Sequence, residues 1–237
     1  MSTSKIFVLG GTGPAGICLL RELLHRNHNV VAYARNPSKI PADLTSNPHL
    51  SIAEGEIDDL KAFSTAIKGC STVISHLGGS INNTNISPTL YSDMYRNTVI
   101  PAMRGNDIKR IFLMGTLVIH RPEDSWSLMK PLVLAYLKLF ARPLYQNILN
   151  VAELFENETQ DLDWTIFRIA DIPGESDEES WRKGREEGKV YVGPLGAKGW
   201  TMSTNRSLLA KWLVDAAESG APEWVRRMPA VTRLAGS

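Results

Sequence analysis

The stretch Gly10-Gly11-Thr12-Gly13-Pro14-Ala15-Gly16 decides the fold that we expect for this chain. It follows the apolar run Lys5-Ile6-Phe7-Val8-Leu9, which is typical of a strand buried on both faces, and Pro14 suits the first turn of a helix. Glycines at such a turn let a pyrophosphate approach the backbone, and the helix N-terminus offers unpaired amides. Four glycines in seven residues exceed what a tight turn alone requires. The spacing, Gly-x-x-Gly-x-x-Gly at Gly10, Gly13 and Gly16, therefore predicts a dinucleotide-binding turn.

Strand-like and helix-like segments alternate beyond this turn. The hydrophobic pattern predicts strands over 29–34, 50–53, 72–77, 110–114 and 164–169, and helices over 14–25, 60–69, 89–104, 143–158 and 205–218. Apolar strands that alternate with helices indicate an α/β fold, a doubly wound parallel sheet of the Rossmann type. We expect one domain over 1–237, in which about 170–237 form a substrate-side elaboration, and a solvated surface segment over 175–188.

The residues after the second predicted strand bear on the choice of cofactor. An acidic residue at this point would hold the ribose 2′-hydroxyl of NAD. The chain instead has Tyr33-Ala34-Arg35-Asn36-Pro37-Ser38-Lys39, which contains no carboxylate. Arg35 could bind a 2′-phosphate in a paired contact, with help from Ser38 and Lys39. We therefore predict NADP(H) rather than NAD(H); a solvated arginine after a strand is the alternative.

Composition excludes several classes of protein. The 237 residues are 43% hydrophobic and 22% charged with a net charge of +1, as in an ordinary globular protein rather than a disordered one. The near-neutral charge argues against a nucleic-acid partner, and no apolar run reaches the roughly 18 residues that a membrane span needs. We find no secretory signal pattern, and two cysteines, Cys18 and Cys70, do not make a disulfide framework. We expect a cytoplasmic protein, a monomer or homodimer, without a metal site.

Further motifs carry a resemblance to a known family. They are Gly55-Glu56-Ile57-Asp58, Ser75-His76-Leu77-Gly78 and Thr165-Ile166-Phe167-Arg168, in addition to the glycine stretch and the segment from Arg35 to Lys39. With them the chain resembles the atypical short-chain dehydrogenases/reductases, more closely the NmrA-like and biliverdin-reductase-B-like NAD(P)H-binding proteins. Members of this group include reductases, dehydratases, epimerases and redox sensors, so the resemblance is specific for fold and cofactor rather than for the reaction.

The resemblance implies positions for the cofactor. It places Thr12, Gly13, Pro14 and Ala15 on the pyrophosphate and Arg35 on the 2′-phosphate. It places Ile57 and Asp58 beside the adenine, and Leu77, Gly78 and Gly79 along the cofactor. The fifth strand of the family usually ends in one or two serines beside the nicotinamide. Here Gly115 and Thr116 stand at these positions, and only Thr116 keeps a hydroxyl.

The catalytic residues are where the chain departs from the superfamily. A Tyr-x-x-x-Lys helix motif lowers the tyrosine pKa so that the phenol transfers a proton. Tyr145 lies on the expected helix, but Leu149 stands four residues later, and the chain contains no Tyr-x-x-x-Lys. Tyr145 is therefore either a proton donor or a ring that packs on the nicotinamide or substrate. His120 is a candidate acid or base or an exposed loop residue, whereas His76 is more simply a structural histidine.

These observations leave three functions open. The first is reduction of a small, mostly apolar or aromatic carbonyl or enone by direct hydride transfer from NADPH. The second is a non-redox dehydratase, isomerase or cyclase, which the missing lysine keeps open. The third is an NADP(H)-sensing protein without turnover. The apolar segment Leu128–Phe140 could be a substrate wall, a self-association surface or a buried helix.

Overall fold

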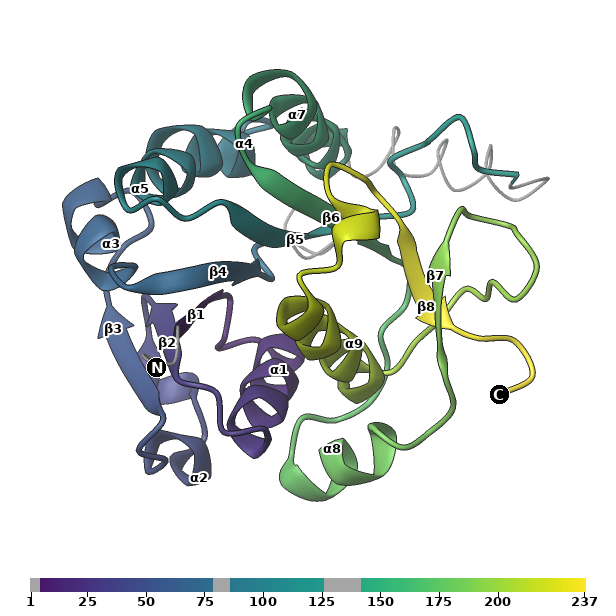
Figure 1. Cartoon of the computed structure of the whole chain (residues 1–237), viewed down its shortest axis with the longest axis horizontal. Coiled ribbons are helices and arrows are strands. Elements are labelled where there is room, and N and C mark those ends of the chain that lie inside the picture. The colour runs from purple at the N-terminus through teal and green to yellow at the C-terminus, as the bar shows by residue number, and fades with distance from the viewer. Residues whose placement is uncertain (1–4, 79–85, 126–141) are drawn as a thin grey trace.

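The computed structural model describes residues 5–78, 86–125 and 142–237. Within these residues the strands form one sheet in the order β3-β2-β1-β4-β5-β6-β8-β7 (Figure 1). The strands are β1 (Lys5–Leu9), β2 (Val30–Ala34), β3 (Leu50–Glu54), β4 (Cys70–Ser75), β5 (Arg110–Thr116), β6 (Asp163–Ile169), β7 (Val190–Gly193) and β8 (Ala230–Arg233). The pairings are parallel except that β7 runs antiparallel to β8. The expected doubly wound parallel sheet is confirmed.

Alternating side chains of the central strands enter two separate cores. On β1, Ile6 and Val8 pack in one core, and Phe7 and Leu9 pack in the other. The same alternation holds on β5, where Phe112 lies in the first core and its neighbours on either side lie in the second. Because both faces are covered, these strands are apolar at every position rather than at every second one.

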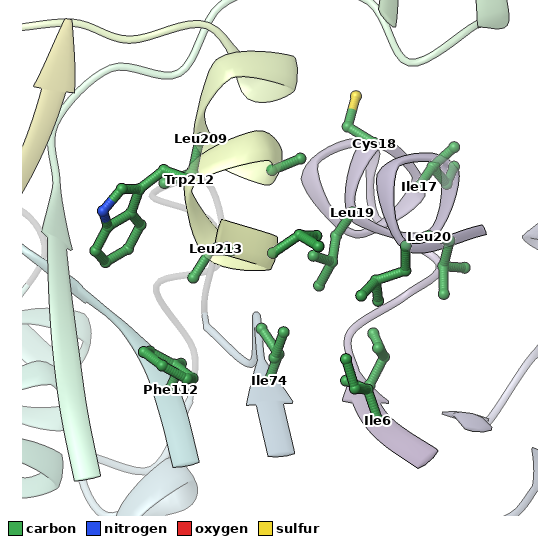
Figure 2. Packing of buried hydrophobic residues seen from close by; sticks show 14 of the residues in the cluster. Ile6, Ile17, Cys18, Leu19, Leu20, Ile74, Phe112, Leu209, Trp212 and Leu213 are labelled. Carbon is green, nitrogen blue, oxygen red and sulfur yellow. The ribbon is translucent and has the colours of Figure 1, made fainter. Parts of the chain in front are cut away.

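Helices cover the two faces of the sheet (Figure 1). The helices are α1 (Pro14–His25), α2 (Ala42–Thr45), α3 (Leu60–Ala66), α4 (Leu90–Met94), α5 (Ile100–Gly105), α7 (Arg142–Glu158), α8 (Glu178–Gly184) and α9 (Arg206–Ser219), with short 3₁₀ or π turns η1 (Pro37–Lys39), η2 (Tyr95–Val99) and η3 (Pro222–Trp224). Helices α1 and α9 pack together over one face, where Leu19 of α1 lies towards α9 and Leu20 lies above Ile6 of β1 (Figure 2). Helices α3, α5 and α7 bury their apolar residues in the core on the other face.

The C-terminal part of the chain differs from the sequence expectation. The sequence pattern did not predict β7 and β8, yet both join the same sheet. The stretch 175–188 contains α8, which buries Trp181 and is therefore not solvated throughout. The expected helix over 89–104 consists of α4, the π turn η2 and α5 in succession. In the part of the chain that the structure describes, no helix is long and apolar enough to cross a bilayer.

Candidate functional site

The turn between β1 and α1 is built so closely that Gly10 and Gly16 cannot carry a side chain without a shift of the backbone. Gly10 has a left-handed φ of +76°, which residues with a side chain rarely adopt. A Cβ on Gly16 would lie 2.1 Å from the carbonyl oxygen of Gly10. Gly13 is the N-cap of α1, and no side chain caps this helix. The amides of the first turn therefore remain open to a ligand, as the sequence predicts.

The register of the sheet brings several chain segments beside this turn. Leu9 pairs with Ser75, and Ser75 pairs with Leu113, so the residues that follow these strands lie along one edge. A pocket of about 200 Å³ opens at this edge. Its lining residues come from the glycine turn, from the ends of β4 and β5, and from the segment after β6 and the start of α9; they are Gly10, Gly13, Pro14, Ala15, Gly16, His76, Met114, Ile172 and Arg206.

The imidazole of His76 lines this pocket in its neutral form. Its Nδ1 is buried and has no hydrogen-bond partner among the described residues, and its ring packs edge-on against Phe167. Burial lowers the pKa of His76 to about 4, so the ring is uncharged at neutral pH. The Nδ1 atom is therefore a buried polar atom at the wall of the pocket that no described residue satisfies.

The residues predicted to read the 2′-phosphate lie next to the glycine turn. Leu9 pairs with Tyr33, so Arg35 follows β2 at the same edge of the sheet as Gly10. Arg35, Ser38 and Lys39 are all exposed, and the Ser38 hydroxyl donates a 2.6 Å hydrogen bond to Asn36 Oδ1. The Arg35 guanidinium has no ion-pair partner within the described residues, so it is available to an anion.

Tyr33 holds the backbone of the segment that we predict to lie beside the adenine. Tyr33 donates a 2.9 Å hydrogen bond to the carbonyl oxygen of Glu56, and a Cβ on Gly55 would lie 2.1 Å from the Tyr33 hydroxyl. Ile57 is partly buried against the core, whereas Asp58 is exposed. The helix that follows is capped by Asp59 rather than Asp58, because Asp59 accepts from the amide of Ala62. The Asp58 side chain therefore does not cap α3.

The end of β5 has no room for a second hydroxyl. A Cβ on Gly115 would lie 2.6 Å from the Ile166 side chain, so no serine fits there. Thr116 is partly buried, and its Oγ1 accepts a 3.3 Å hydrogen bond from the amide of Val118. Its hydroxyl proton remains available to a ligand.

A buried ion pair anchors the loop that follows β5. The guanidinium of Arg168 on β6 donates two hydrogen bonds of 2.6 and 2.9 Å to Asp124, and both side chains are fully buried. Burial alone would raise the pKa of Asp124, but the hydrogen bonds from Arg168 and from the amides of Leu195 and Arg121 hold that pKa below its ordinary value. The Nδ1 of His120 lies 3.6 Å from Asp124 Oδ2, and the His120 side chain is 52% exposed. His120 is therefore a surface histidine beside a fixed carboxylate.

Tyr145 lies near the start of α7 and is half-buried. Two residues later, Asn147 is fully buried and ties α7 to α4: its side-chain oxygen accepts a hydrogen bond from the amide of Tyr91, and its side-chain nitrogen donates a 3.1 Å hydrogen bond to the carbonyl of Pro143 within α7. Leu149, which stands where the superfamily has lysine, is partly buried. The structure thus holds the helix in place around Tyr145 without a neighbouring ammonium group at that position.

Only some of the predicted site residues line the pocket. Of the predicted residues, Gly10, Gly13, Pro14, Ala15 and Gly16 line it. The others lie outside its lining, and they are Thr12, Arg35, Ser38, Lys39, Ile57, Asp58, Leu77, Gly78, Gly115, Thr116, His120 and Tyr145. Gly79 and Leu128–Phe140 lie outside the described residues.

Sequence reasoning did not assign Met114, Ile172 and Arg206 to the site. Met114 lies within β5 and Ile172 lies shortly after β6, so the apolar side chain of each is equally typical of a core residue. A signal for Arg206 was present, because a cation in the first turn of a predicted helix opposes the helix dipole and so suggests another role. Among the described residues, no group of three or more histidine, cysteine, aspartate or glutamate side chains could hold a metal ion.

Comparison with known proteins gives the family. A family model described as NAD(P)H-binding matches residues 10–219. The chain belongs to this NAD(P)H-binding family. The match begins at the first glycine of the turn and ends with α9, so it includes every segment that lines the pocket.

Solved structures share the fold of this NAD(P)H-binding protein at low sequence identity. A short-chain dehydrogenase/reductase from Veillonella parvula has a TM-score of 0.75 and 15% identity, over 98% of this chain and 94% of that one. The wide-type form of a Veillonella parvula short-chain dehydrogenase/reductase in complex with NADP has a TM-score of 0.71 and 16% identity, over 97% and 94%. The anaerobillin reductase ChuY from Escherichia coli O157:H7 has a TM-score of 0.67 and 17% identity, over 97% of each chain. The fold implied by the resemblance is therefore confirmed.

Curated relatives match this chain over a shorter stretch of sequence. The 3 beta-hydroxysteroid dehydrogenase/Delta 5-->4-isomerase of Mycobacterium tuberculosis (strain ATCC 25618 / H37Rv) is 35% identical over 69 residues, which are 29% of this chain. The matched region spans 18% of that enzyme's length.

Proposed function

We propose that this chain is an NADP(H)-dependent oxidoreductase that reduces a small, mostly apolar or aromatic carbonyl or enone compound. The observation that carries the proposal is the pocket in which the uncapped N-terminus of α1 faces the neutral His76 and the apolar side chains of Met114 and Ile172. The first feature suits a diphosphate and the last two suit an apolar substrate. Residues 1–237 would act as one nucleotide-binding domain, with the part after about residue 170 on the substrate side.

The preference for NADP(H) rests on Arg35. Its exposed guanidinium follows β2, where no carboxylate stands to repel a 2′-phosphate. Replacement of a charged hydrogen-bond partner costs about 1.5–3 kcal/mol. We expect Arg35→Ala to weaken NADPH binding about 10- to 100-fold and to leave NADH binding almost unchanged.

The first test measures binding. Thermal unfolding of the wild type is followed with NADPH, NADP⁺, NADH and NAD⁺, because a ligand of the native state raises the midpoint. Dissociation constants for NADPH and NADH are then compared between the wild type, Arg35→Ala and the control Arg227→Ala. Arg227 is also exposed, but it lies beside Thr165 near the start of β6, away from the ligand edge. A wild type that responds to none of the four nucleotides would refute the proposal, and equal losses of NADPH and NADH in Arg35→Ala would refute the NADP preference.

The proposed reaction gives roles to residues at the end of β5, in the loop after it and near the start of α7. When bound, the nicotinamide supplies a hydride. As a carbonyl carbon accepts a hydride, negative charge develops on its oxygen, and the Thr116 hydroxyl would donate a hydrogen bond to it. Tyr145, His120 or a water molecule would then give that oxygen its proton. The anaerobillin reductase among the structural neighbours supports reductase chemistry on this fold.

The second test measures turnover. NADPH absorbance is followed with a panel of quinones, flavins and aromatic ketones. We expect oxidation of NADPH with at least one class, a marked loss of kcat in Thr116→Val, and a change in the pH profile of kcat in Tyr145→Phe or His120→Gln, whichever residue gives the proton. Binding of NADPH without oxidation across the panel would favour the sensing or non-redox functions, which the Leu149 substitution for lysine keeps open.

A further inference from the structure

Arg206 brings a charge to the cofactor pocket from the C-terminal third of the chain. Among the residues that line the pocket it is the charged one at neutral pH, because His76 is neutral there and the lining contains no carboxylate. The glycine turn, which lines the same pocket, offers only backbone amides. A cofactor diphosphate carries two negative charges, so the turn alone leaves them without a cationic partner.

The surroundings of Arg206 hold it in place without using its charge. Its amide donates to the carbonyl of Pro173, and the amide of Thr204 donates to the carbonyl of Asp171, so the start of α9 is tied to the segment that carries Ile172. Ser207 Oγ lies 4.0 Å from Cys18 Sγ, which sets the first turn of α9 against the second turn of α1. Cys18 and Leu209 mark these two helices in Figure 2. Within the described residues, the Arg206 guanidinium has no hydrogen-bond or ion-pair partner.

The position of Arg206 is unfavourable for its own helix. It is the first residue of α9 after the N-cap Asn205, and the positive end of the helix dipole disfavours a cation there. Other arginines of the described residues, such as Arg168 and Arg185, are paired with carboxylates. An unpaired arginine at a helix N-terminus, lining one pocket together with a second helix N-terminus, is explained by an anionic ligand in that pocket.

We infer that Arg206 binds the diphosphate of the bound cofactor together with the amides of the glycine turn. The inference rests on the proposed binding of the cofactor in this pocket. It assigns the two arginines different parts of one ligand, the 2′-phosphate to Arg35 and the diphosphate to Arg206. Arg35 then distinguishes NADPH from NADH, whereas Arg206 serves both.

The experiment compares dissociation constants at fixed ionic strength for NADPH, NADH and 2′-phospho-ADP-ribose, which has the diphosphate but no nicotinamide. The variants are Arg206→Met, which keeps the aliphatic stem, Arg206→Lys, Arg35→Ala and the control Arg227→Ala. We expect Arg206→Met to weaken all three ligands by the same factor, about 10-fold or more, and Arg206→Lys to lose less. Arg227→Ala should bind like the wild type, and the melting temperatures of the free proteins identify any variant that fails to fold.

The outcomes separate this inference from the proposed function. Unchanged nucleotide affinity in Arg206→Met, with a raised KM for an anionic substrate or with no other change, overturns the inference and leaves the proposed function intact. A loss confined to NADPH and NADH overturns it as well, because Arg206 would then contact the nicotinamide end. A wild type that binds none of the nucleotides overturns both.

Discussion

The ligand edge of the sheet is made of backbone at β1 but of buried charged side chains at β5 and β6. At β1, Gly10 and Gly16 approach so closely that no Cβ fits between them. At β6, the fully buried Arg168 reaches across to the fully buried Asp124, which lies in the loop after β5. The glycine turn at β1 leaves backbone amides free for a ligand. In the Arg168–Asp124 pair the polar groups bind each other and fix the loop after β5.

The difference teaches where the stability and the binding energy of the molecule reside. A buried charge that loses its partner is costly, whereas a surface that is open to ligand contributes little to folding. Changes at the Arg168–Asp124 pair should therefore act on folding first, and a side chain at Gly16 of the glycine turn should act on folding and cofactor binding together. The following three predictions test this separation.

The largest effect on stability is expected from Arg168→Met. The substitution leaves Asp124 buried with two amide donors but without its guanidinium, which costs about 3–5 kcal/mol of unfolding free energy. Urea unfolding measures this loss. The double variant Arg168→Met with Asp124→Leu should recover much of it, because no buried charge then remains. A loss below about 1 kcal/mol in the single variant would show that water reaches the pair.

A smaller loss of stability, joined to a loss of binding, is expected from Gly16→Ala. Its Cβ would meet Gly10 and Gly11 backbone atoms at 2.1 and 2.7 Å, so the turn must shift, at a cost of about 3 kcal/mol. NADPH affinity should fall with it.

Two glycine variants serve as controls for this prediction. Gly105→Ala places its Cβ in open space and should keep both stability and affinity. In Gly13→Ala the new Cβ meets only the Gly10 carbonyl oxygen, at 3.7 Å, so the variant should keep its stability. It should lose affinity for NADPH, because the added methyl group lies at the turn that we propose to bind the diphosphate. Equal affinities of Gly13→Ala and the wild type would place the diphosphate elsewhere.

The smallest effect is expected from the titration of His76. Its pKa is about 4 in the folded protein and near 6.5 in the unfolded chain, so the unfolded state binds the extra proton between these values. The contribution of His76 to stability is then fully present well above pH 6.5 and is lost as the pH decreases towards 4, by about 2.5 kcal/mol at pH 4.5. His76→Asn should show a shallower decrease over this window in urea unfolding. Glu22 and Asp124 also have lowered pKa values, but both proteins share them, so the difference between the two curves isolates His76. Parallel curves would mean that His76 is solvated.

The sequence allowed the backbone-built part of the site to be predicted but not the part built by distant side chains. The glycine turn is local, so its residues, their order and their chemistry all lie within seven positions. His76 and Arg206 line one pocket only because packing over the whole sheet places β4 and α9 near α1. The strands from Lys5 to Ile169 were predicted because both of their faces are buried. In contrast, β7 is short and only partly buried, so its residues carry a weak pattern.

The contact between α1 and α9 also sets the order in which the chain can fold. Cys18 and Leu209 belong to one core, although most of the chain separates them. A ribosome adds about 5–20 residues each second, so α1 would wait on the order of ten seconds or more for α9 to be synthesised. During that time the apolar face of α1, including Leu19 and Leu20, has no final partner, and the pocket beside Arg206 does not exist. The nascent chain therefore acquires its affinity for nucleotide only near the end of its synthesis, and its first helix is the segment that a chaperone would need to shield.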